Sequence, residues 1–158
     1  MGTRSVPAIW TEVSLELLTL VDRDGLHRDT GRTLTLPFLG GRVGEEAMLA
    51  SDAPQLARGD HLILFADTSQ LPYPTLGGRS GILRVLEGRV FTYEGRPVLS
   101  ISKQGFLVGA SADAPARGPF PEPVGAARGR PVELKEGEPM SLEDALAALQ
   151  GLMREARP

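Results

Sequence analysis

Side chains that could hold a catalytic metal are sparse in this sequence. The chain contains two histidines, His27 and His61, and no cysteine. Zinc hydrolases of the helical type need two histidines one turn apart beside a glutamate, and neither histidine stands in such a frame. The lack of cysteine also excludes disulfides, thiolate catalysis and cysteine-ligated metals. We therefore expect no metal site and no cofactor.

Three further motifs have the residue types of known hydrolases without the context that their chemistry needs. An aspartic protease requires two carboxylates that share a proton. Residues 29–31 (DTG) and 67–69 (DTS) resemble its triplet, but His27-Arg28 precede the first one where an apolar strand is needed. Ser100 and Lys103 have the spacing of serine acyl-enzymes, in which the serine begins a helix rather than ending a strand. The sequence predicts turns, no catalytic residue and no enzyme.

A small barrel that binds single-stranded nucleic acid combines a basic groove with stacking aromatic rings. The chain has 17 basic and 20 acidic residues and a net charge of -3, which gives little attraction for phosphate. Arginines that alternate along strands are typical of a solvated face. Nucleic acid is therefore not the expected partner, and an oligonucleotide- or oligosaccharide-binding barrel is the alternative function. The groups that it would use are Phe91, Tyr93, Phe106, Arg84, Arg89 and Arg96.

The candidate binding residues lie in a long loop over residues 67–81, which contains two prolines and three glycines. Loops of this length in compact domains are commonly functional. Tyrosine adds a large apolar ring with a polar tip, a group that contributes strongly to interfaces. Two interpretations stay open: Tyr73 contacts a protein partner, or it folds back and caps the barrel. The candidate residues are Leu71, Pro72, Tyr73, Pro74 and Leu76.

Period-two alternation predicts the strands that must position such a site. Over residues 10–21, apolar and polar side chains alternate, which predicts a half-buried strand. Leu18 and Leu20 make the second face apolar, so we expect cover on both faces at that end. Gly88 predicts a bulge or a close backbone approach, and Glu94-Gly95 predicts a two-residue hairpin turn. Further strands are predicted at 33–36 (ending before Pro37), 47–51, 61–65, 82–86, 89–93, 96–101 and 106–108, with turns at 22–25 and 58–60.

A helix is predicted after a linker or surface loop rich in proline, glycine and alanine. Ser141 is a suitable N-cap, with Asp144 three residues later. The apolar stripe at helical spacing packs either on its own domain or on a partner. Its members are Leu142, Ala145, Leu146, Leu149, Leu152 and Met153.

These elements predict a mainly β fold, a small OB-like barrel or sandwich with a C-terminal α-helix. A chain of 158 residues suits one domain with a sizeable core. The expected division is a β domain over 8–108, a loop or linker over 109–131, and a C-terminal segment over 132–156 whose helix packs on the β domain.

The order of turns and strands resembles an uncharacterised class of bacterial extracytoplasmic β domains, some of which lie beside matrixin-type metalloprotease domains. The resemblance covers about residues 10–101 and the helix, and it implies a compact β barrel, an extracytoplasmic setting and no catalytic residue. The motifs that carry it are Thr11-Glu-Val-Ser14, the glycine pair before Val43-Gly44, Ala53-Pro54, Arg58-Gly59-Asp60, Leu62-Ile-Leu-Phe65, residues 86–91 (LEGRVF) and Gly95-Arg-Pro-Val98.

The function expected from the sequence is that of a non-catalytic accessory or protein-binding domain, with an unidentified protein as partner. No apolar run approaches the about 18–20 residues that span a bilayer, so no membrane span is expected. The resemblance implies a periplasmic or secreted location, with a targeting segment absent from this chain; a cytoplasmic location is the alternative. The sequence predicts no oligomeric state.

Overall fold

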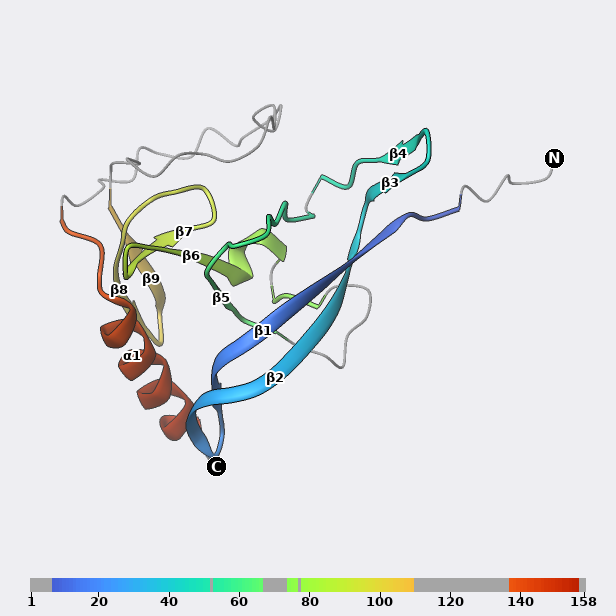
Figure 1. The fold of residues 1–158 in the computed structure, drawn as a ribbon. Helices are drawn as coiled ribbons and strands as arrows, with labels where there is room; N and C mark the ends of the chain where they lie inside the picture. Colours follow the sequence, from blue (N-terminus) through green and yellow to red (C-terminus); the bar gives the residue numbers. More distant parts are fainter. Residues whose placement is uncertain (1–6, 52, 67–73, 77, 110–136, 157–158) are drawn as a thin grey trace. The chain divides into compact units, whose positions relative to one another are not determined.

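The computed structural model describes residues 7–51, 53–66, 74–76, 78–109 and 137–156 (Figure 1). Over these residues the chain is mainly β, with four small antiparallel sheets and one C-terminal helix, as predicted. None of the sheets formed by the described residues closes into a barrel, so the barrel stays a prediction. The elements are β1 (Trp10–Asp22), β2 (Gly25–Leu39), β3 (Gly41–Val43), β4 (Glu46–Met48), β5 (Leu62–Leu64), η1 (Gly78–Gly81), β6 (Ile82–Leu86), β7 (Arg89–Thr92), β8 (Val98–Ser102), β9 (Gly105–Val108) and α1 (Leu142–Glu155).

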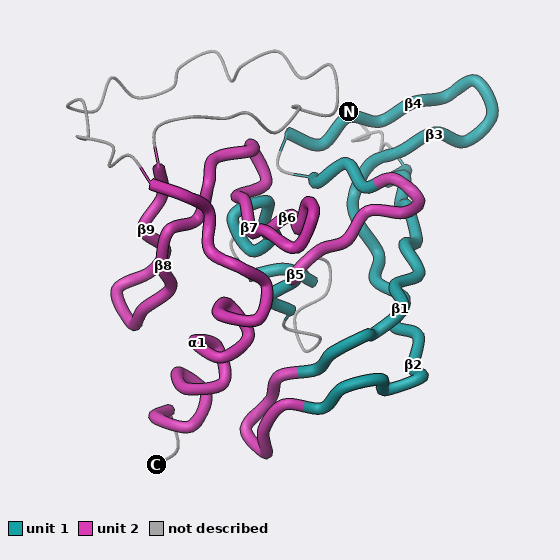
Figure 2. Tube along the Cα trace, turned by 60° about the vertical axis from the view of Figure 1, so that its left-hand side comes forward, with its two compact units in different colours: residues 1–20, 27–56, 64–82 teal, residues 21–26, 57–63, 83–158 magenta. Residues whose placement is uncertain are grey.

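The chain forms two compact units, which Figure 2 shows in different colours. Unit 1 comprises Met1–Leu20, His27–Leu56 and Leu64–Ile82. Unit 2 comprises Val21–Leu26, Ala57–Ile63 and Leu83–Pro158. The predicted domain boundary at 108 lies close to residues that the structure does not describe, and the boundary at 131 lies among them. The predicted division into a β domain, a linker and a C-terminal segment therefore stays a prediction.

Strands β1 and β2 form a two-stranded ribbon (Figure 1). The predicted alternation in β1 is confirmed: Val13, Leu15 and Leu17 are half-buried, and the polar residues between them are exposed. Leu18 is 50% exposed, so the expected cover on both faces at that end is wrong for this residue. The physical reason is that the strict alternation continues through Leu18 and places it on the polar face.

Strand β2 continues through Pro37, whereas the sequence analysis ended it there. Leu36 and Phe38, on either side of the proline, are buried in unit 1. The Gly40 amide donates to the Ile9 carbonyl, so alternation directs the nitrogen of position 37 to the opposite edge of β2. A proline is tolerated there because no described strand needs a hydrogen bond from it.

The turns of unit 1 and of the ribbon follow the predicted residues with small shifts. At the tip of the ribbon, the Asp22 carboxylate accepts hydrogen bonds from the amides of Asp24 (2.8 Å) and Gly25 (3.1 Å). The strand predicted at 47–51 is the shorter β4, which pairs with β3 from Gly41↔Met48 to Val43↔Glu46. Side chains and short-range hydrogen bonds therefore define these turns where the sequence places them.

Gly88 is a turn residue and not the predicted bulge. Glu87 (φ 49°) and Gly88 (φ 73°) both have positive φ, and Leu86 pairs with Arg89 across them. A two-residue hairpin loop with both φ values positive is the type I′ geometry, which matches the twist of the flanking strands. The two predicted strands on either side of this glycine, at 82–86 and 89–93, are β6 and β7.

The next hairpin has a three-residue loop, so the predicted two-residue turn at Glu94-Gly95 is wrong. The Thr92 amide donates to the Arg96 carbonyl (2.8 Å), which encloses Tyr93, Glu94 and Gly95. Gly95 has a φ of 90°, as the last residue of such a loop requires. Strand β8 begins at Val98 rather than at the predicted residue 96.

Helix α1 begins as predicted, because the Ser141 hydroxyl accepts a hydrogen bond from the Asp144 amide (3.1 Å). Within unit 2, α1 packs against β7 and β8. Ala145, Leu146 and Leu149 are buried, as the apolar stripe predicts. These side chains therefore serve the core of this chain rather than a partner.

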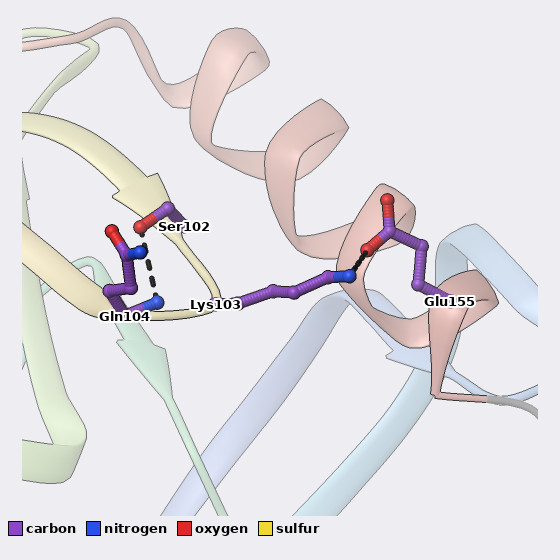
Figure 3. A network of polar contacts seen from close by, with 4 residues as sticks. All are labelled: Ser102, Lys103, Gln104 and Glu155. Atoms are coloured by element: carbon purple, nitrogen blue, oxygen red, sulfur yellow. Dashed lines mark hydrogen bonds and ion pairs between the residues drawn. The ribbon is translucent and has the colours of Figure 1, made fainter.

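The far end of α1 carries an exposed ion pair to the β8–β9 turn (Figure 3). Lys103 Nζ lies 2.7 Å from Glu155 Oε2, and the two side chains are 73% and 56% exposed. The turn itself is held by the Gln104 amide, which donates to the Ser102 hydroxyl (3.2 Å). Exposed ion pairs of this kind contribute about 0.2–1 kcal/mol, so burial of the leucines stabilises the attachment of α1 more than the ion pair does.

We expect Leu149→Ala to lower the free energy of unfolding by about 2–5 kcal/mol, because it removes a buried side chain and leaves a cavity. Urea denaturation measures the change. The control is Leu107→Ala in the same unit, since Leu107 is 42% exposed. Equal midpoints for the two variants would contradict the packing of α1 on the strands.

Two glycine-to-alanine substitutions in unit 2 should change stability in opposite directions. A Cβ at Gly88 or Gly151 meets nothing within 4 Å, so backbone conformation alone decides the effect. Gly88→Ala is expected to destabilise by about 1 kcal/mol or more, because alanine disfavours positive φ. Gly151→Ala is expected to stabilise α1 by about 0.5–1 kcal/mol. Thermal and urea unfolding would test both, and shifts of the same sign would contradict the turn geometry.

Candidate functional site

Alternate residues along β1 form a continuous exposed row, which we call the outer face of β1. Every second residue from the start of the strand to Leu18 is exposed. Trp10 (41% exposed) and Leu18 (50%) stand at the ends, and two glutamates lie between them. Tryptophan is enriched in protein interfaces, which makes this row a candidate contact surface. The outer face consists of Trp10, Glu12, Ser14, Glu16 and Leu18.

Contacts at the start of β1 determine that Trp10 faces outward. The Thr11 hydroxyl donates to the Gly40 carbonyl (2.7 Å), and the Gly40 amide donates to the Ile9 carbonyl (2.7 Å). A Cβ at Gly41 would collide with the Thr11 hydroxyl, so this glycine permits the close approach. Because neighbouring side chains alternate, attachment of Thr11 to the end of β2 directs Trp10 to the other side.

Hydroxyl groups join the two strands of the ribbon. On the exposed face, the Ser14 and Thr35 hydroxyl oxygens are 3.2 Å apart and share a hydrogen bond. Near the other end, the Thr30 hydroxyl donates to the Leu17 carbonyl. Ser14 therefore has a partner in β2, while Glu12 and Glu16 on either side of it are exposed.

The backbone of β1 has one edge that no described strand pairs with, since β2 is its only neighbour in the sheet. The carbonyls of Ile9 and Leu17 both point toward β2 or its continuation. Backbone groups in a strand alternate between its two edges. The amides and carbonyls of Glu12, Ser14 and Glu16 therefore point to the unpaired edge.

Exposed large apolar side chains concentrate in unit 1. Among the described residues, unit 2 contributes only Leu107 to this group. Leu49, beyond the end of β4, is the most exposed at 87%. The unit 1 members are Trp10, Leu18, Val43, Leu49 and Leu76.

The loop site predicted from the sequence is described only at its end. Leu71, Pro72 and Tyr73 lie outside the described residues, and the role of Tyr73 stays a prediction. Pro74 is buried, whereas Leu76 is 55% exposed, with its amide bound to the Phe65 carbonyl (2.8 Å). The structure thus places these two predicted residues in contrasting environments.

The motifs tested for catalysis are not brought together among the described residues, and residues 67–69 lie outside the description. Across the part of the chain that the structure describes, no three histidine, aspartate or glutamate side chains gather as metal ligands. Residues 29–31 lie within β2 rather than in the expected turn, where Asp29 (φ 47°) and Gly31 (φ 61°) kink the strand. Lys103 pairs with Glu155, not with Ser100. Residues 58–60 form a turn, held by the Ala57 amide on Asp60 Oδ2 (2.8 Å).

The sequence pattern contains the signal for the outer face of β1. The alternation over residues 10–21 already places Trp10 and Leu18 on the same side as the glutamates.

No family model, curated protein or solved structure matches this chain. No helix among the described residues is long and apolar enough to cross a membrane.

Proposed function

We propose that this chain is a non-catalytic accessory β domain that binds another protein through the outer face of β1. One observation carries the proposal: Trp10 and Leu18 are exposed at the two ends of a row that includes Glu12 and Glu16, beside a strand edge that no described strand occupies. Aromatic and leucine side chains supply apolar contact area, and the carboxylates supply electrostatic selectivity.

The alternative, an oligonucleotide- or oligosaccharide-binding barrel, has weaker support. Two exposed glutamates on the row would repel a phosphate backbone. In unit 2, Arg84 is only 7% exposed, in the central strand of the β5–β6–β7 sheet and opposite Phe91. Arg84, one of the three arginines that such a groove would use, is therefore buried and not available at the surface.

Replacement of the two apolar residues of the row tests the proposal. We expect Trp10→Ser/Leu18→Ser to reduce capture of a specific protein from extracts of the native organism by about tenfold or more, the loss typical of an interface anchor. The melting temperature should change little, because both side chains are largely exposed. Quantitative mass spectrometry of the captured proteins gives the measurement.

Leu107→Ser is the matched control, since Leu107 is an exposed leucine of unit 2. It should leave capture unchanged. Equal capture by the double variant and the wild-type protein would contradict the proposal, as would a loss of equal size in the control.

The proposed setting is extracytoplasmic, supported by the resemblance to domains that accompany matrixin-type metalloproteases. We expect the product of the native gene to fractionate with the periplasm or the medium. Immunoblotting of cell fractions, with a cytoplasmic enzyme as marker, measures this. Co-fractionation with that marker would contradict the proposed location and would leave the binding surface unaffected.

A further inference from the structure

We infer that the partner supplies an extended segment that adds to β1 as a third strand, with basic side chains opposite Glu12 and Glu16. This inference rests on the proposed function and specifies the chemistry of its partner. The segment is defined by its backbone pairing and by its charge pattern, which follow from separate features of β1.

The backbone argument begins with the unpaired edge of β1. The outward amides and carbonyls of Glu12, Ser14 and Glu16 form a row of donors and acceptors with strand spacing. No described strand occupies that row. An extended peptide satisfies such an edge by the same ladder of hydrogen bonds that joins β1 to β2, the mode known as strand addition.

The side chains of β1 specify which peptide fits. Glu12 and Glu16 are four residues apart on one face, so directly opposite positions of an added strand are also four apart. Opposite charges across a strand pair are favourable, which selects lysine or arginine at those two positions. The two residues opposite Val13 and Leu15 fall on the other face, beside these half-buried side chains, which selects apolar side chains there. The segment therefore alternates apolar and polar residues, with basic groups four apart.

A second copy of this chain is a poorer occupant of the same edge. Antiparallel pairing of β1 with its own copy would place one row of glutamates against the other, for example Glu12 opposite Glu16. Like charges directly opposite one another destabilise a strand pair. The glutamates thus act against self-association and favour a basic partner, as charged edge residues do in other sheets.

Synthetic peptides test the inference on the whole chain. The probe alternates valine with threonine and carries two lysines four residues apart; a second peptide carries glutamates in their place. We expect the lysine peptide to bind with an affinity about tenfold or more above that of the glutamate peptide, the sum of two cross-strand charge pairs and the loss of two repulsions. Fluorescence anisotropy measures both affinities.

A charge reversal provides the variant. Glu12→Lys/Glu16→Lys should reverse the preference between the two peptides. The control Glu45→Lys/Glu46→Lys, which changes two exposed glutamates at the β3–β4 turn, should leave the preference as in the wild-type protein. An unchanged preference in the Glu12/Glu16 variant would overturn the inference.

Alternate N-methylation of the lysine peptide tests the backbone pairing without altering the protein. Methyl groups on one alternate set of amides should abolish binding, and those on the other set should leave it intact, because only one set faces β1. Equal binding of both methylated peptides, or no binding of the unmodified one, would overturn strand addition. A self-association of the wild-type chain that blocks the peptide would do the same.

Failure of this inference is distinguishable from failure of the proposed function. If the peptides do not bind but Trp10→Ser/Leu18→Ser still loses a captured protein, the surface binds by side-chain contact and not by strand addition. If the peptides bind as expected but capture is unaffected, strand addition stands for this edge while the role of the two apolar residues is wrong.

Discussion

Side chains along β1 alternate between an inner and an outer face, and unit 1 depends on this alternation. Because β1 pairs with β2 alone among the described strands, one face of the ribbon can be covered by core while the other is left to solvent. A shift of one residue would exchange the two faces. The contacts of Thr11 and Ile9 with Gly40 and the turn at Asp22 hold the two ends of the ribbon in the register that places Val13 and Leu15 on the inner side and Glu12 on the outer.

This constraint also explains why the acidic residues stand where they do. A long strand with an unpaired edge and exposed apolar side chains is prone to pair with other chains. Glu12 and Glu16 interrupt the apolar character of the outer face between Trp10 and Leu18. The same charges that discourage indiscriminate association make the edge selective for a basic strand, so specificity and solubility follow from one arrangement.

Unit 2 is stabilised by a different arrangement, in which short hairpins present apolar residues to a capped helix. Leu83, Val90 and Val98 have almost no exposure, and Ala145 and Leu149 lie on the buried side of α1. A backbone hydrogen bond also joins the segment just before the helix to β7, because the Val90 amide donates to the Met140 carbonyl (3.0 Å). Apolar burial and backbone hydrogen bonds therefore attach the helix to the strands.

Local chemistry by itself determined much of the structure. The alternation of β1, the Asp22 turn and the Ser141 cap depend on residues close in sequence, so a linear pattern contains the information. The loop at Tyr93 to Gly95, by contrast, is one residue longer than Glu94-Gly95 suggests, because it is closed by the Thr92–Arg96 hydrogen bond and the Phe91–Pro97 bridge.

Tertiary structure alone decided the features that depend on which neighbours a strand has. Pro37 stays within β2 because its nitrogen faces an edge that no described strand occupies. Arg84 is buried although it is charged, and Leu18 is exposed although it is apolar. A sequence pattern shows which side chains share a face, but contacts distant along the chain decide whether that face is covered.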